Sequence, residues 1–301
     1  MIFGFAGIFV SAQEAKMPFG VFDENGNFFG QLKTTDIRLL QLKKSAQVIS
    51  VEPKFANALE IIIMIDASAS QEAVIPQERE AAIAFIKDVL DKDKDKVAVV
   101  KFSGAVLLEQ DLTNEFSKAI EKIKQIDFEL PSDFNRGTNP DKSVPIKGST
   151  SIWDSINQVL QSFAKIKSDS RKAILLISDG TNTSGEAKLK ETINLALKSR
   201  IPIFAIGIGD DEFGGADKKT LQKLTEQTNG AAIFKKKKPE DLLPQIKTLA
   251  TSLRSFYEIT FTPISTNSKE SLQEVKIEII NPDLRKRKFQ ILQPKGFFFS
   301  K

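Results

Sequence analysis

The stretch LEIIIMIDASAS, residues 59–70, decides the fold of this chain. Residues 59–65 are an almost uninterrupted apolar run of strand length, which is typical of a strand buried on both faces of a parallel sheet. At Asp66 the run gives way to a loop of small and polar residues. We therefore expect a central, buried strand with a polar loop at its carboxyl end.

Strand-like and helix-like segments alternate along the chain after this loop. Further apolar runs of strand length lie at residues 97–102, 173–178 and 203–207. Helix-like segments lie around them at residues 78–90, 114–126, 152–166, 187–198, 218–228 and 239–253. This alternation predicts an α/β domain of the Rossmann-like kind, with a doubly wound, mostly parallel sheet.

Both flanks of this region are strand-like. The N-terminal flank carries an Asn25-Gly26 turn between apolar runs, and strand-like runs follow the last helix at residues 256–261, 274–280 and 285–292. The last two runs are predicted to form a hairpin, joined by a turn at residues 281–283. We predict a small β-sandwich built from the N- and C-terminal strands, with the α/β domain inserted between them. The alternative is a single domain with extra strands. The predicted boundaries are 13–57 and 255–301 for the two parts of the sandwich and 58–254 for the α/β domain.

The N-terminus resembles a secretory signal peptide. Residues 2–10 are short, apolar and uncharged, and Val10-Ser11-Ala12 suits cleavage after Ala12. The usual basic segment is missing, and the alternative is an uncleaved apolar tail. Because the run is too short to span a bilayer, the expectation is a signal peptide at residues 1–12 and an exported protein that is periplasmic, on the cell surface or secreted.

The composition excludes several classes of site. The chain has no histidine and no cysteine, which removes Ser-His-Asp and thiol catalysis, disulfides and the usual zinc sites. A bound metal must then be held by oxygen, which favours Mg²⁺, Mn²⁺ or Ca²⁺. The net charge of +4 is small for 301 residues and does not indicate a nucleic acid or a membrane surface as partner.

Candidate metal ligands lie next to the ends of three predicted elements, two strands and one helix, and these ends should meet at one edge of the sheet. Asp66, Ser68 and Ser70 follow the buried strand, Thr150 precedes a predicted helix, and Asp179 closes the strand at 173–178. Two carboxylates and three hydroxyls suit Mg²⁺ that retains water, with Mn²⁺ or Ca²⁺ as alternatives. Such a site keeps a coordination position open for an incoming carboxylate. Taken singly, each piece is also typical of an ordinary turn or helix cap.

The joint pattern resembles the metal-ion-dependent adhesion site of von Willebrand factor type A (VWA) domains. DASAS matches the DxSxS loop of that family, Thr150 in GST matches its threonine, and Asp179 in LLISDG matches its second aspartate. The resemblance covers roughly residues 59–253. It implies that Asp66, Ser68, Ser70, Thr150 and Asp179 bind the cation directly or through water. It also implies that the cation binds an acidic residue of a protein partner.

A narrower resemblance extends over nearly the whole chain. The bacterial VWFA-related group, first described as acidobacterial, is similar in its DENGN-like turn, in LRSFYEITFTP and in a final basic hairpin at residues 284–298. Two departures from the common VWA pattern matter. Ala69 stands where DxSGS has glycine, and residues 131–147 resemble an insertion that contains a rival threonine, Thr138. The helix that begins directly after Thr150 favours Thr150.

These features predict a metal-dependent protein-binding module without catalytic activity. One alternative is a structural or assembly factor whose metal is satisfied internally or absent. Another is a metal-assisted phosphohydrolase, although Ser68 occupies the position where such enzymes usually carry a second acid. A Gly207-Ile208-Gly209 sequence lacks the third glycine of a dinucleotide fingerprint and is followed by acids, so we reject it. The partner, the physiological metal and the oligomeric state remain open at this stage.

Overall fold

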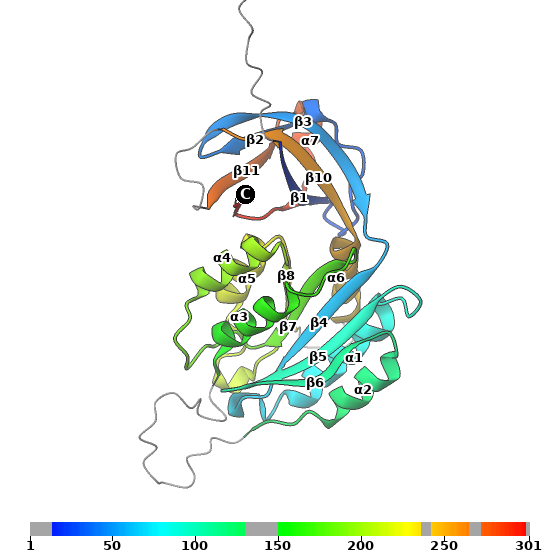
Figure 1. The fold of residues 1–301 in the computed structure, drawn as a ribbon, viewed down its shortest axis with the longest axis vertical. Helices are drawn as coiled ribbons and strands as arrows, with labels where there is room; N and C mark the ends of the chain where they lie inside the picture. The colour runs from blue at the N-terminus through cyan, green and yellow to red at the C-terminus, as the bar shows by residue number, and fades with distance from the viewer. Residues whose placement is uncertain (1–13, 130–149, 236–241, 265–271, 299–301) are drawn as a thin grey trace, which may run out of the picture.

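The computed structural model describes residues 14–129, 150–235, 242–264 and 272–298, which fold into two units, each built on one sheet. Figure 1 shows the α/β unit below an antiparallel sheet made from both ends of the chain. The chain enters the α/β unit from β3 (Lys44–Phe55) into β4 (Leu59–Asp66) and leaves through α6 (Leu242–Arg254) into β10 (Ser255–Thr262). The two connections are adjacent, since β3 and β10 pair with each other. The α/β unit is therefore an insertion in the antiparallel unit.

The α/β unit contains a six-stranded sheet in the order β6-β5-β4-β7-β8-β9. All neighbouring strands run parallel except the edge pair of β5 and β6. The remaining strands are β5 (Lys96–Phe102), β6 (Val106–Thr113), β7 (Arg171–Ser178), β8 (Ile203–Gly207) and β9 (Ala232–Phe234). The predicted doubly wound, mostly parallel sheet is confirmed.

Helices cover both faces of this sheet (Figure 1). One apolar layer packs α1 (Ile75–Val89), α2 (Phe116–Gln125) and α6 against the sheet, and the other packs α3 (Ile152–Phe163), α4 (Leu189–Ser199) and α5 (Lys218–Gln227). Strand β4 is buried at all of its positions and supplies both layers. Ile61 and Ile63 lie in the first layer, and Ile62 and Met64 lie in the second. This two-sided burial explains why the strand is apolar without alternation.

The second unit is one curled antiparallel sheet of seven strands, in the order β12-β1-β10-β3-β2-β11-β13. Besides β3 and β10 it contains β1 (Ala15–Phe22), β2 (Ile37–Gln41), β11 (Gln273–Ile279), β12 (Gln290–Leu292) and β13 (Gly296–Phe297). A single apolar core packs in this unit, with Phe19, Tyr257 and Phe261 fully buried. The Asn25-Gly26 turn forms as predicted, because the Asp23 carboxylate accepts hydrogen bonds from the Asn25 and Asn27 amides.

Neither of the two hairpins predicted near the C-terminus forms. Residues 274–280 and 285–292 do not pair with each other, and within residues 284–298 β12 pairs with β1 while β13 pairs with β11. The short helix α7 (Pro282–Arg285) follows β11, and β12 pairs with β1 instead of β11. The Asn281 side chain accepts hydrogen bonds from the amides of Asp283 and Leu284, and Pro282 occupies the first turn. This combination of a cap and a proline starts a helix where the sequence suggested a strand turn.

Tyr257 anchors the loop between β1 and β2 to the core of the antiparallel sheet. Its hydroxyl accepts a hydrogen bond from the Leu32 amide at 2.9 Å and donates one to the Phe29 carbonyl. Tyr257→Phe leaves both loop groups without this partner at almost unchanged volume. We expect it to lower the free energy of unfolding by about 1–3 kcal/mol. Urea denaturation of the two proteins measures the difference, and an unchanged midpoint would mean that the hydroxyl contributes nothing.

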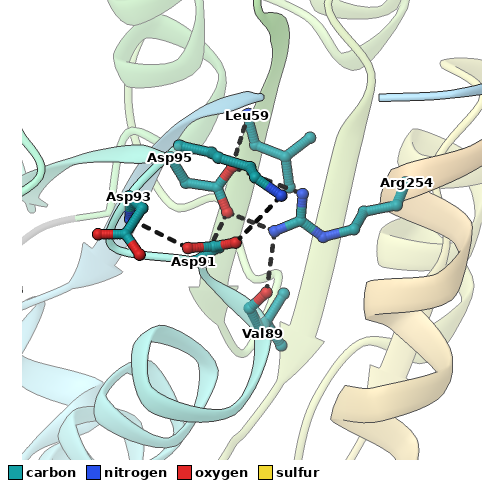
Figure 2. Close-up of polar contacts among 7 residues, drawn as sticks. Leu59, Val89, Asp91, Asp93, Asp95 and Arg254 are labelled. Atoms are coloured by element: carbon teal, nitrogen blue, oxygen red, sulfur yellow. Dashed lines mark hydrogen bonds and ion pairs between the residues drawn. The ribbon is translucent and has the colours of Figure 1, made fainter. Parts of the chain in front are cut away.

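A buried carboxylate joins the elements at which the chain enters and leaves the α/β unit (Figure 2). Asp95 is fully buried, and its two oxygens accept hydrogen bonds from the amides of Leu59, at the start of β4, and Asp91, both at 2.8 Å. It also pairs with Arg254, the last residue of α6, which donates to the Val89 carbonyl at the end of α1. Asp95 and Arg254 thus tie α1, β4 and α6 together beside the junction.

Candidate metal centre

The loop after β4 folds back on the carboxylate that begins it. One oxygen of Asp66 accepts the Ser68 amide at 3.0 Å, and the other accepts the Ser178 hydroxyl at 2.7 Å. A short 3-10 turn (Ala69–Gln71) then brings the second serine hydroxyl towards the first. The Oγ atoms of Ser68 and Ser70 are 3.1 Å apart. The fold thus gathers the oxygens of this loop at the carboxyl end of β4.

Asp179 meets this loop from the end of the neighbouring strand β7. Its Oδ2 atom lies 3.5 Å from the Ser70 hydroxyl, and its Oδ1 atom accepts the Thr181 amide at 2.7 Å. Since β4 and β7 are parallel neighbours, their carboxyl ends reach the same edge of the sheet. Hydrogen bonds therefore connect four of the five predicted ligands, Asp66 and Ser68 on one side and Ser70 and Asp179 on the other, through the pair of serines.

Thr150 lies at the same edge but is held differently. It is 3% exposed, its amide donates to the Thr183 hydroxyl at 2.9 Å, and its carbonyl accepts the amides of Thr183 and Ser184. The next residue, Ser151, bonds to the carbonyl of Ser103 after β5. Thr150 is thus positioned between the loops after β5 and β7. Within the described chain, no hydrogen bond joins its hydroxyl to the other four predicted ligands. The rival Thr138 lies outside the described residues.

Three residues that the sequence analysis did not select belong to this site. Ser178 donates to Asp66, as described above. The Gln71 amide nitrogen donates to Asp179 at 2.8 Å and to Ser70 at 3.1 Å. Glu78, on the buried face of α1, is fully buried. The one signal for Glu78 in the sequence is an acidic residue in an otherwise apolar helical stripe.

The site gathers acidic side chains away from solvent. The pKa of Asp66 is raised to about 7, chiefly by burial and in part by the nearby Asp179, while hydrogen bonds from Ser178 and Ser68 act in the opposite direction. Burial also raises the pKa of Glu78 well above its ordinary value, with added contributions from Asp66 and Asp179. None of the ion pairs among the described residues includes any of these three acids. A bound cation would supply the missing positive charge.

The donor set is mixed. In the part of the chain that the structure describes, no three acidic side chains form an all-carboxylate metal site. The gathered oxygens come instead from Asp66, Asp179 and serine hydroxyls, which is the chemistry of a hard divalent cation that keeps some of its water. The residues present therefore fit such an ion.

The raised pKa of Asp66 predicts a pH dependence for EDTA-treated protein. The pKa of Asp66 is about 7 in the folded protein, above its ordinary value of 3.8, so the folded state binds the proton more tightly than the unfolded state does. The stability that this proton adds to the folded state is complete below about pH 4 and is lost as the pH rises through about 7. From pH 5 to pH 7 the loss amounts to about 2 kcal/mol for one such group. Glu78, whose pKa is also raised, contributes a slope of the same sign, so we expect Asp66→Asn to reduce the pH dependence in parallel urea titrations by about this amount without abolishing it. Equal pH slopes in the two proteins would contradict it.

Comparisons with known proteins agree on one family. The model of the von Willebrand factor type A domain matches residues 60–249. Inter-alpha-trypsin inhibitor heavy chain H2 of the mouse is 26% identical over 212 residues, 69% of this chain and 20% of the relative. The chain thus spans about a fifth of the length of that protein.

The similar solved structures are more distant in sequence. Proximal thread matrix protein 1 from the mussel byssus has a TM-score of 0.50 and 19% identity, and the match covers 71% of this chain and 51% of that one. A von Willebrand factor type A protein from Catenulispora acidiphila has a TM-score of 0.49 and 13% identity, over 97% of this chain and 76% of the other. At such identity the mussel structure supports the fold alone.

Proposed function

Because this chain belongs to the von Willebrand factor type A domain family, we propose that it is a metal-dependent protein-binding module. Domains of this family commonly mediate protein interactions that require a metal. The observation that supports the proposal here is the hydrogen-bonded arrangement of Asp66, Ser68, Ser70 and Asp179 at one sheet edge, with buried acids and no basic partner among the described residues. Thr150 completes the proposed ligand set.

The proposed residues would contribute two kinds of oxygen ligand, carboxylates and hydroxyls. Asp66 is held rigidly by Ser68 and Ser178 and would supply the main negative charge, and Asp179 would bind the cation directly or through water. The hydroxyls of Ser68, Ser70 and Thr150 add neutral oxygen donors. Mg²⁺ suits this set, with Mn²⁺ and Ca²⁺ as alternatives. A bound cation with an open position would then accept a carboxylate oxygen from a protein partner.

We further propose that the protein is exported and has no catalytic activity. The described residues contain no helix long and apolar enough to cross a membrane. The absence of histidine and cysteine removes the usual proton carriers and nucleophiles from the site. Many VWA proteins act outside the cell, which supports export, and the apolar segment at residues 2–10 supports it independently.

One observation favours a second function, that of an assembly factor whose site needs no metal. The Gln71 amide already donates hydrogen bonds to Asp179 and Ser70, and a nitrogen that carries two protons cannot bind a cation. In an assembly factor of this kind, the Gln71 amide would remain hydrogen-bonded to Asp179 and Ser70, and no cation would bind these oxygens. Partner binding that is insensitive to EDTA would favour this second function.

The experiment that tests the proposal measures partner binding with and without metal. Immobilised protein is exposed to an envelope extract of the source organism in Mg²⁺ or in EDTA, and Asp66→Ala serves as the matched control in Mg²⁺. We expect proteins that are retained in Mg²⁺ to be lost in EDTA and in the variant. Retention that is equal under all three conditions would overturn metal-dependent binding.

Calorimetry gives an independent readout without a partner. Mg²⁺ or Mn²⁺ is titrated into protein that has been treated with EDTA and desalted. We expect one cation per chain. Absence of binding by the unmodified protein would overturn the metal site itself, whatever the extract shows.

A further inference from the structure

Glu78 has no partner that explains its burial. Both of its carboxylate oxygens are inaccessible to solvent and lack a hydrogen bond, and it is not a member of any ion pair among the described residues. An isolated buried carboxylate is costly, and native proteins keep such groups where a specific charge or function compensates them. Glu78 must therefore either stay neutral or have its charge balanced by a cation nearby.

Glu78 lies at the end of α1 that is nearer to the loop of residues 66–70, which we call the metal loop. Glu78 lies in the helical stripe of Ile75, Ala82, Phe85 and Ile86, which packs against the sheet. It is one turn after the start of the helix, and the helix follows the metal loop almost directly. Helix α1 contacts both β4 and β7, the strands whose carboxyl ends carry Asp66 and Asp179. Glu78 is thus buried near the edge where the proposed ligands meet.

Electrostatics identify the same neighbours. The two acids that raise the pKa of Glu78, after burial, are Asp66 and Asp179. The three carboxylates do not gather closely enough to form an all-acid site in the described chain. Glu78 is therefore close enough to interact with the charges of the proposed ligands, although it is not itself placed as a ligand.

We propose that Glu78 is a positioning residue of the metal centre: a bound divalent cation favours the charged form of Glu78, and the resulting buried negative charge increases the affinity of the site for that cation. This inference rests on the proposed function, because it assumes that a cation binds at Asp66 and Asp179. The attraction between Glu78 and the cation would be electrostatic and would act without direct contact. Because the Glu78 side chain is fully buried, dissolved salt would screen this attraction only weakly. In the metal-free protein the raised pKa keeps Glu78 protonated, and the positive charge of a cation nearby would favour release of that proton.

The test is calorimetric titration of Mg²⁺ and Mn²⁺ into three proteins: the unmodified chain, Glu78→Gln and Glu80→Gln. Glu80 is on the same helix and exposed, so Glu80→Gln makes the same change of charge at the surface. We expect Glu78→Gln to weaken binding by about tenfold or more, the size seen when residues that support metal ligands are changed. We expect Glu80→Gln to change the affinity by less than about twofold, since exposed charges are screened.

Two further readouts separate this role from a structural one. The loss of affinity in Glu78→Gln should persist when the ionic strength is raised, since buried charges are screened little. In EDTA, Glu78→Gln and the apolar variant Glu78→Leu should unfold at urea concentrations equal to or above that of the unmodified protein, because both remove an uncompensated carboxyl group. A structural role would instead lower their stability in EDTA and leave metal affinity unchanged.

The outcomes distinguish this inference from the proposed function. If the unmodified protein binds no cation, the proposed metal site fails and Glu78 has no such role. If the unmodified protein and Glu78→Gln bind the cation equally well, the metal site stands and the role of Glu78 is overturned.

Discussion

Asp66→Ala is expected to abolish measurable binding of Mg²⁺ and Mn²⁺. Asp66 is the carboxylate around which the loop closes, with the Ser68 amide on one oxygen and the Ser178 hydroxyl on the other. Its loss removes a charged ligand and also the acceptor that holds the loop. Because changes in residues that only support a ligand reduce metal affinity by roughly ten- to hundredfold, we expect a reduction of more than about a hundredfold here. Calorimetry and the metal-induced shift in Tm both measure it.

The matched control for this variant is Asp283→Ala. Asp283 is in the antiparallel unit, with a side chain that is 87% exposed, and should not alter cation binding. Asp66→Ala removes a buried carboxylate without a basic partner among the described residues, but it also removes the acceptor of the Ser68 amide and the Ser178 hydroxyl, so circular dichroism in EDTA first establishes that the variant is folded. Cation binding of normal strength in folded Asp66→Ala would place the metal elsewhere in the protein.

Asp95→Ala is expected to give the largest loss of stability. The substitution leaves the amides of Leu59 and Asp91 without their acceptor and removes the partner of Arg254. Breaking a buried pair of this kind costs about 3–5 kcal/mol. The effect should be large because Asp95 joins α1, β4 and α6 at the junction between the two units (Figure 2). Urea denaturation followed by circular dichroism measures the change.

Asp93→Ala is the control in the same loop. The Asp93 side chain is exposed, and its backbone amide, which bonds to Asp91, is retained in the variant. We therefore expect a change within about 0.5 kcal/mol, as for most surface substitutions. If Asp95→Ala were as mild as Asp93→Ala, the buried cluster would not stabilise the junction.

The α/β sheet could be predicted because its signals are local. The apolar run that became β4 needed no knowledge of its neighbours, since a strand buried on both faces is apolar at every position. The insertion of this unit between two β segments could also be predicted, because the sequence changes from strand-like flanks to alternating strand-like and helix-like segments. Asp66 and Asp179 could be placed at one edge because parallel strands end on the same side.

The antiparallel unit was harder to predict because its pairing is long-range. Strand β1 pairs with β10 and β12, which lie more than 230 residues later in the chain. Residues 285–292 contain a strand-like pattern, yet the cap of Asn281 makes the first part helical and only the last part joins the sheet. A sequence pattern specifies which residues favour a strand and does not specify their partner.

The site was predicted in part for the same reason. DASAS and Asp179 can be recognised in the sequence because they directly follow predicted strands. Gln71 and Glu78 have no such signal, and only the folded chain places them beside the other residues of the site. Gln71 follows the loop as an ordinary polar residue, and only the structure brings its amide to Asp179. The narrower resemblance to the acidobacterial-type group stays a prediction, since the comparisons establish the VWA family as a whole.

The central claim is that a divalent cation binds among Asp66, Ser68, Ser70, Thr150 and Asp179. Its most direct test is X-ray diffraction from crystals grown with Mn²⁺, recorded on both sides of the manganese absorption edge. The account predicts one anomalous peak per chain, surrounded by oxygen atoms of these residues and by water. The absence of a peak at this edge of the sheet, or a peak held by other residues, would contradict it.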